Sequence, residues 1–199
     1  MNVKKELETK VGIANGLYLN NIEIDPFTIK AVMINEVVPP DPVQDFYGEP
    51  SADYQKTIIP FFQFAGNHVS SIFDILQMGI YVTNAVKTPK VGYSIDRSCI
   101  ENSLPYLEAE LSLFPNIKVV MLMGDVAKKA FNMLTRKSVK KNIIPSVSTY
   151  RLRNSEIYYE SIRIMPSYIT TGGNLLIEKS KVTMIIEDIA AMLKIIDNI

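Results

Sequence analysis

Residues 117–134 read IKVVMLMGDVAKKAFNML, and this stretch decides the fold class. Its first seven residues form a short apolar run, which is typical of a strand buried in a sheet. The run ends at Gly124, and Asp125 is a suitable N-cap because its side chain can accept a hydrogen bond from the first turn of a helix. The apolar residues that follow have helical spacing. A strand followed directly by a helix indicates a layered α/β fold.

Three further stretches predict strands. KAVMI at 30–34 and GIYVT at 79–83 are short apolar runs followed by turn-forming or polar residues, and EIYYESIRI at 156–164 has the mixed polarity of an edge strand. Helical spacing of apolar residues recurs over 100–114 and most regularly over 182–196. The second of these predicts a helix that packs on the sheet or, alternatively, a dimer interface. We therefore predict an α/β protein with four strands.

Length and composition indicate one domain. The chain has 199 residues, of which 47% are apolar, and it contains no repeat and no Gly/Ser-rich linker, so we expect a single domain over residues 1–199. The N-terminal residues lack the apolar core of a signal peptide, and no apolar run approaches the roughly 18 residues of a membrane span. These features predict a monomeric cytoplasmic protein with no membrane contact.

A scarcity of metal-binding residues limits the chemistry. Cys99 and His68 are the only cysteine and histidine, which excludes disulfides within the chain and zinc or iron–sulfur sites built from Cys and His of one chain. We expect neither a metal nor another cofactor. The 21 basic residues balance the 21 acidic ones. Net charge therefore gives no argument for nucleic acid, although a local basic patch can exist on a neutral protein.

Two polar residues follow predicted strands, where ligands of open α/β sheets bind. Glu36 follows the first strand and could orient a water molecule or stabilise a developing cation, unless it is a solvated loop residue. Asn84 follows the second strand. Its amide offers a donor beside an acceptor, the pairing that reads the edge of a nucleobase, but a simple turn former has the same position. Lys87, three residues later, could meet a phosphate.

Three other stretches supply further candidates. PFFQFAG at 60–66 has three phenylalanines in four positions, which suits core packing or a stacking platform for a planar ligand. MPSYITTGGN at 165–174 offers hydroxyl and backbone N–H groups to a phosphate, although an ordinary strand-to-helix loop looks similar. RKSVKK at 136–141 is the densest basic run. It predicts a solvated surface first and a nucleic-acid contact second.

The order and spacing of these motifs resemble the uracil-DNA glycosylase superfamily, in particular its iron–sulfur bacterial and archaeal branch. The family's GEAPG, PFVGRAG, YITNVVKCRPP and HPSYLL motifs, and the helix and strand between the last two, are similar to five stretches of this chain. These are NEVVP (35–39), PFFQFAG (60–66), YVTNAVKTP (81–89), MPSYIT (165–170) and SLPYLEAELSLFPNIKVVMLMGDVA (103–127). The resemblance implies a three-layer α/β/α fold with a central, mainly parallel four-stranded sheet.

The resemblance also implies roles for individual residues. Phe61 would stack on a base that has been flipped out of the DNA, and Asn84 would read its amide edge. Glu36 would orient the hydrolytic water or stabilise the oxocarbenium-like sugar. Lys87 and Ser167 would contact phosphates. The implied reaction is hydrolysis of the N-glycosidic bond of uracil or another deaminated base.

The departures from the family pattern are as informative as the matches. Thr88 and Ser103 stand where the iron–sulfur branch has cluster cysteines, so the cluster should be absent. Met165 stands at the base-contacting position where much of the superfamily has a histidine that donates a hydrogen bond to the departing base. Methionine has no such donor. Loss of one preorganised donor typically costs on the order of 100- to 1000-fold in rate.

Two hypotheses of different classes follow. The first is a DNA glycosylase, slow or altered in specificity, whose partner is DNA containing a damaged or deaminated base. The second is a non-catalytic protein on the same fold that binds a nucleobase, a nucleotide or nucleic acid. A basic rim formed by Lys87, Lys90 and Arg97 around the site would favour DNA, whereas a neutral rim would favour a small ligand.

Overall fold

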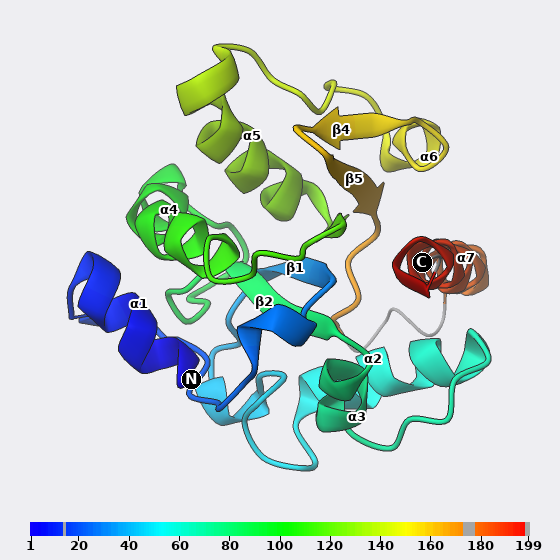
Figure 1. Cartoon of the computed structure of the whole chain (residues 1–199), viewed down its shortest axis with the longest axis horizontal. Helices are drawn as coiled ribbons and strands as arrows, with labels where there is room; N and C mark the ends of the chain where they lie inside the picture. Colours follow the sequence, from blue (N-terminus) through cyan, green and yellow to red (C-terminus); the bar gives the residue numbers. More distant parts are fainter. Residues whose placement is uncertain (14, 173–177, 198–199) are drawn as a thin grey trace.

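The computed structural model describes residues 1–13, 15–172 and 178–197, and it has a five-stranded sheet between two layers of helices (Figure 1). The strand order is β2-β1-β3-β5-β4. Neighbouring strands run parallel except β4 and β5, which pair antiparallel. The strands are β1 (Ala31–Val37), β2 (Ile80–Val86), β3 (Val119–Met123), β4 (Ile157–Tyr159) and β5 (Ile162–Ser167).

Helices connect the strands and cover both faces of the sheet. The helices are α1 (Val3–Val11), α2 (Asp53–Phe64), α3 (Ile72–Gln77), α4 (Arg97–Leu111), α5 (Asp125–Val139), α6 (Thr149–Leu152) and α7 (Lys179–Asp197), with short 3-10 helices at Pro26–Thr28 and Pro42–Gln44. In the described ranges, no helix combines the length and apolar character needed to cross a membrane.

Two apolar clusters fill the space on the two sides of the sheet, because successive side chains of a strand point to opposite faces. Val32 and Ile34 of β1 pack with residues of α1, α4 and α5 on what we call the α5 side. Ala31 and Met33 of the same strand pack with residues of α2, α3 and α7 on the α7 side. Each polar residue near the end of a strand therefore belongs to one side or the other.

The predicted α/β class and the mainly parallel sheet are confirmed, and the helix predicted over 182–196 is α7, which packs on the sheet. The expected number of four strands is wrong by one. Residues 156–164 contain β4, a turn and the start of β5 rather than a single strand, since Glu160 adopts a left-handed φ of 54° and the chain reverses there. The short β4 is thereby added at the edge of the sheet.

Candidate functional site

The carboxyl ends of β1 and β2 bring two asparagine side chains to the same face. Asn35 and Asn84 are register partners of these parallel strands, so both side chains lie on the α7 side of the sheet. Both are buried. Asn84 is the predicted base-reading residue, whereas sequence reasoning did not select Asn35 as a site residue.

The Asn84 amide is held by a carboxylate that the motifs did not reveal. Its Nδ2 donates to Oδ1 and to Oδ2 of Asp45, each at 2.9 Å. Asp45 belongs to the connection between β1 and α2, and its Oδ1 also accepts from the backbone N–H of Phe46 at 2.8 Å. Among the described residues, Oδ1 of Asn84 has no hydrogen-bond partner although it is buried. The amide thus has a fixed orientation and one free acceptor.

Burial changes the acidity of Asp45. Removal of the carboxyl group from water raises its pKa from 3.8 to about 6, and the hydrogen bonds from Asn84 and Phe46 oppose that shift. Burial raises the pKa because it disfavours the charged form of the carboxyl group. It is the stronger of the two effects. A small change in surroundings can therefore switch the charge of Asp45 near neutral pH.

Asn35 leaves a complementary atom free. Its Oδ1 accepts a hydrogen bond of 2.5 Å from the hydroxyl of Thr170, which follows β5. Within the described part of the chain its Nδ2 donates to nothing, and it is buried. Unpartnered buried polar atoms cost roughly 1–3 kcal/mol each and call for an explanation. Here one donor and one acceptor stand on neighbouring strands at the same edge of the sheet.

Glu36 lies on the other side of the same edge. It follows Asn35 in β1, so its side chain points to the α5 side, where its carboxylate accepts the backbone N–H of Val126 at 3.0 Å. Burial raises the pKa of Glu36, the nearby Asp125 raises it further, and the Val126 hydrogen bond and Lys90 lower it. Glu36 is thereby anchored to the first turn of α5, where helix N–H groups favour a carboxylate.

Met165 and Ser167 lie at the end of β5. Met165 is buried on the α7 side, opposite Met121 of β3 in the register of the sheet. The hydroxyl of Ser167 donates to Oδ2 of Asp188 in α7 at 2.5 Å, and Asp188 also accepts from Nε of Arg153. The Ser167 hydroxyl therefore belongs to a buried network. Gly173 and Asn174, at the end of the same motif, lie outside the described residues.

Phe61 and Lys87 are placed differently from their predicted roles. The ring of Phe61 is completely buried in the core of the α7 side, so it presents no open face to a ligand. Lys87 is 2% exposed, and its Nζ donates to Glu110 and to Thr83, both at 2.6 Å. It neutralises a buried carboxylate and is not available to a phosphate at the surface. The aromatic residue next to Asp45 in the chain is Phe46.

A family model for the uracil DNA glycosylase superfamily matches residues 47–172, which is more than half of the chain. The chain belongs to the uracil DNA glycosylase superfamily. Comparison with curated proteins finds no match. The matched range includes Asn84 and Met165, whereas Asn35, Glu36 and Asp45 precede it.

The iron–sulfur cluster found in one branch of this superfamily does not fit the residues present. Ser103 stands at a cluster position, but its hydroxyl accepts the backbone N–H of Lys87 and donates to the carbonyl of Cys99, both at 2.8 Å. Thr88 stands at another cluster position. The chain has a single cysteine, and a cluster requires several thiolates.

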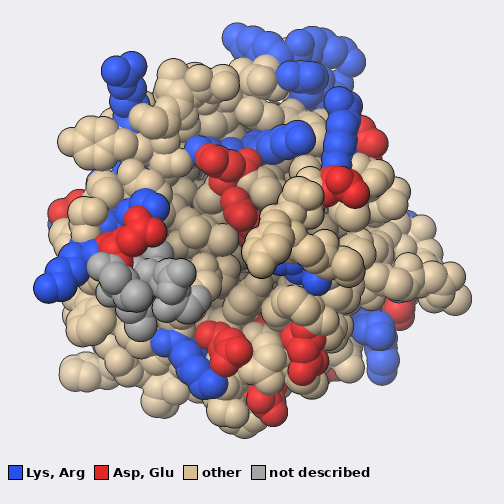
Figure 2. Space-filling model, turned by 180° about the vertical axis from the view of Figure 1, so that it is seen from behind, with Lys and Arg blue, Asp and Glu red and all other residues tan. Residues whose placement is uncertain are grey.

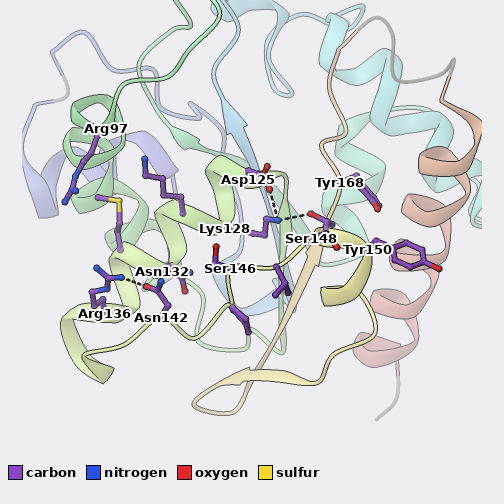
Figure 3. A pocket seen from close by; sticks show the side chains of 15 residues that line it. Arg97, Asp125, Lys128, Asn132, Arg136, Asn142, Ser146, Ser148, Tyr150 and Tyr168 are labelled. Atoms are coloured by element: carbon purple, nitrogen blue, oxygen red, sulfur yellow. Dashed lines mark hydrogen bonds and ion pairs between the residues drawn. The ribbon is translucent and has the colours of Figure 1, made fainter.

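A basic groove of about 740 Å³ opens beside the N-terminus of α5 (Figure 3). One wall is a face of α5, and the other is the segment 142–150 together with Tyr168. Four cationic side chains and one carboxylate line it: Arg97, Lys128, Lys129, Arg136 and Asp125. The predicted basic rim consisted of Lys87, Lys90 and Arg97, and of these only Arg97 lines this groove. The other cations of the groove belong to α5.

Charge elsewhere is mixed. Figure 2 shows acidic and basic side chains interspersed over one face, with cations gathered at its upper edge, where Figure 1 has the end of α5. The basic run 136–141 lies at that end and is exposed. Net charge thus hides a local concentration of cations along one helix.

Proposed function

We propose that this protein hydrolyses the N-glycosidic bond of uracil or another deaminated base in DNA. The observation that carries the proposal is the buried amide of Asn84, whose orientation is fixed by Asp45 and whose carbonyl oxygen has no partner in the described structure. Membership of the superfamily supports DNA as the substrate.

The unpartnered atoms suit a base with a lactam or imide edge. Such an edge carries an N–H beside a carbonyl oxygen, so its N–H would donate to Oδ1 of Asn84 and its oxygen would accept from Nδ2 of Asn35. An enzyme that acts on a base must first take it out of the stack, at a cost of a few kcal/mol. Two hydrogen bonds that only a flipped base can complete would offset part of that cost.

Glu36 would act on the sugar rather than on the base. A nucleotide seated over the edge of the sheet would direct its base to the α7 side, toward Asn84, and its sugar toward Glu36 on the α5 side. A carboxylate there would orient a water molecule or stabilise positive charge that develops on the sugar. The anchoring hydrogen bond from Val126 supports this role because it holds the carboxylate at the edge.

Stabilisation of the leaving base is the weak element. Met165 offers no hydrogen-bond donor to a base that gains negative charge as it departs. We therefore expect slow hydrolysis. Phe61 is given no stacking role, because its ring packs within the apolar core of the α7 side. Lys87 and Ser167 are given no phosphate contact, because their polar atoms are engaged inside the protein.

The test is release of free base from oligonucleotides that contain uracil, hypoxanthine or xanthine, in single and double strands. The wild type is expected to release at least one of these bases, and Asn84→Ala is expected to reduce release by on the order of 100-fold. Asn102→Ala, an exposed position on α4, is the matched control and should behave as the wild type. No release from any substrate would contradict the proposal.

Met165→His tests the weak element directly. If the scaffold lacks only its donor, the substitution should raise the rate of base release by on the order of 100-fold. Met165→Gln is a companion variant with a neutral amide donor, which cannot carry a positive charge as an imidazole can, and it should give a smaller gain. An unchanged rate in both variants, with active wild type, would contradict the assignment of Met165 to the leaving base.

Met165 also favours a second candidate, a protein that binds a base without cleaving the bond. This alternative predicts that an oligonucleotide with a deaminated base binds more tightly than the undamaged one and that this preference survives Glu36→Gln, with no free base formed by either protein. Base release by the wild type would exclude it.

A further inference from the structure

The groove beside α5 has cations that are available to a ligand. Lys129 and Arg136 are exposed, and no carboxylate of the described residues lies within ion-pair distance of either. Arg136 donates to Oδ1 of Asn142 across the groove at 2.6 Å. By contrast, Lys128 pairs with Asp125 at 2.7 Å and donates to the hydroxyl of Thr149 at 2.8 Å. Two positive charges are thus left without a negative partner in a concave surface.

The spacing of these cations follows the helix. The residues of α5 that line the groove recur at intervals of three and four from Asp125 to Arg136, so they form one continuous face. The eleven steps along the helix from Asp125 to Arg136 extend about 16 Å. Each strand of a DNA duplex has one phosphate per about 3.4 Å of axis, and an extended single strand spaces its phosphates more widely, so a few phosphates of a single strand fit over that length.

The groove begins beside the residues that anchor Glu36. Its first α5 residue, Asp125, precedes Val126, whose N–H binds Glu36. Its other wall includes Tyr168, which follows Ser167 at the end of β5. A nucleic-acid strand that leaves the edge of the sheet on the α5 side would therefore enter the groove at this end.

Aromatic side chains stand at the same end. Tyr150 is 67% exposed, and Figure 3 shows it and Tyr168 near each other on the side of the groove away from Arg97 and Arg136. An exposed aromatic ring beside a row of cations is typical of surfaces that bind single-stranded nucleic acid, where unpaired bases stack on the ring while cations follow the backbone. Paired bases of a duplex offer no such free face.

We propose that the groove between α5 and residues 142–150 binds a single strand of DNA, with its phosphates on Lys129 and Arg136 and a base stacked on Tyr150. The choice of DNA rests on the proposed function. The groove would hold the strand that flanks the flipped nucleotide, so the protein would favour damaged bases in single-stranded or opened DNA over those in intact duplex.

The test measures binding of an undamaged, fluorescein-labelled single-stranded 15-mer by anisotropy at several salt concentrations. Lys129→Gln/Arg136→Gln should weaken binding roughly 10- to 30-fold at 0.1 M salt and lower the slope of log affinity against log salt by about 1.4, since each contact contributes about 0.7 for a single strand. Lys5→Gln/Lys10→Gln, on the exposed surface of α1, is the charge-matched control and should change neither quantity by as much.

Substitutions of Tyr150 test base stacking separately from the effect of charge. Tyr150→Ala should weaken binding roughly fivefold or more without altering the salt slope, and Tyr150→Phe should bind as the wild type because stacking needs only the ring. Equal binding by the α5 variant and the α1 control would overturn the proposal, as would tighter binding of the matched duplex that is insensitive to Tyr150→Ala. Because this strand has no damaged base, the result does not depend on whether the protein cleaves a glycosidic bond.

Discussion

Near the ends of β1 and β2, the two sides of the sheet treat their buried polar groups in opposite ways. On the α5 side, Lys87, Glu110 and Thr83 form a closed network in which the ammonium group contacts both partners at 2.6 Å. On the α7 side, Asn35 and Asn84 each keep one buried atom without a partner among the described residues. A closed network stabilises the fold, whereas an open one costs free energy unless a ligand completes it. The comparison points to the α7 side as the place where a ligand's polar edge is recognised.

The closed network should give the largest loss of stability when it is opened. Lys87→Met would leave Glu110 buried beside Thr83 and Tyr81 without its cation, and the free energy of unfolding should fall by about 3–5 kcal/mol. Urea denaturation followed by circular dichroism measures the change. Lys10→Met, an exposed position on α1, should change it by less than about 0.5 kcal/mol.

A loss below about 1 kcal/mol for Lys87→Met would mean that Glu110 finds water or takes up a proton. The double variant Lys87→Met/Glu110→Gln tests the cause of a larger loss. If burial of the unpaired charge is the cause, the second substitution should recover most of the lost stability, because it removes the charge and keeps the shape.

Asp45 on the α7 side should make stability depend on pH. Its pKa is about 6 in the folded protein and 3.8 ordinarily, so the folded state holds the proton more tightly than the unfolded chain does. The resulting stabilisation is complete below pH 3.8 and is lost as the pH rises through about 6. Over that window the loss amounts to roughly 3 kcal/mol, at about 1.4 kcal/mol for each pKa unit.

Asp45→Asn removes this titration while it keeps a side chain that can accept from Asn84. The stability of the variant relative to the wild type should therefore rise by roughly 3 kcal/mol between pH 4 and pH 7, measured by urea denaturation at each pH. The same substitution at the exposed Asp41 is the control and should stay within about 0.5 kcal/mol across the range. A constant difference for Asp45→Asn would show that its carboxyl group is as well solvated as an exposed one.

Sequence patterns predicted the fold of this protein better than its candidate site. The strand runs and the stripe of α7 are local patterns, and burial follows from them directly. Asn84 could be found because it is the first polar amide after the apolar run of β2. Asp45 could not, since its contact with Asn84 depends on how the connection after β1 folds back over β2. Phe61 and Lys87 were assigned roles from their motifs, but a motif match does not tell which of its side chains are buried in the core.

The opposite orientation of neighbouring side chains along β1 is the feature of the site that could be predicted from the sequence. Asn35 and Glu36 are neighbours, and adjacent residues of a strand point to opposite faces. A motif that aligns Glu36 with a catalytic acid therefore also places Asn35 on the side of Asn84, opposite the acid. The two proposed roles, base recognition and action on the sugar, fall on two sides of one strand end for this geometric reason.

The smallest expected effect tests the anchoring of Glu36 on the α5 side. Gly124 has a φ of 105°, and a Cβ there would collide with the Glu36 carboxylate. Gly124→Ala should lower stability by about 1–3 kcal/mol and displace the carboxylate, with a loss of any base release. Gly92→Ala is a matched control, because Gly92 has a φ of 82° with open space around it and so adds the backbone strain without the collision.

The difference in the loss of stability between Gly124→Ala and Gly92→Ala measures the cost of the collision with Glu36. If Glu36 is held at the edge by α5, Gly124→Ala should be the more destabilising, and combining it with Glu36→Ala should return its cost to that of Gly92→Ala, because the shortened side chain leaves room for the Cβ. Equal costs in the two single variants would mean that Glu36 moves away freely. In that case its carboxylate is not a preorganised group, and the proposed action of Glu36 on the sugar loses its support.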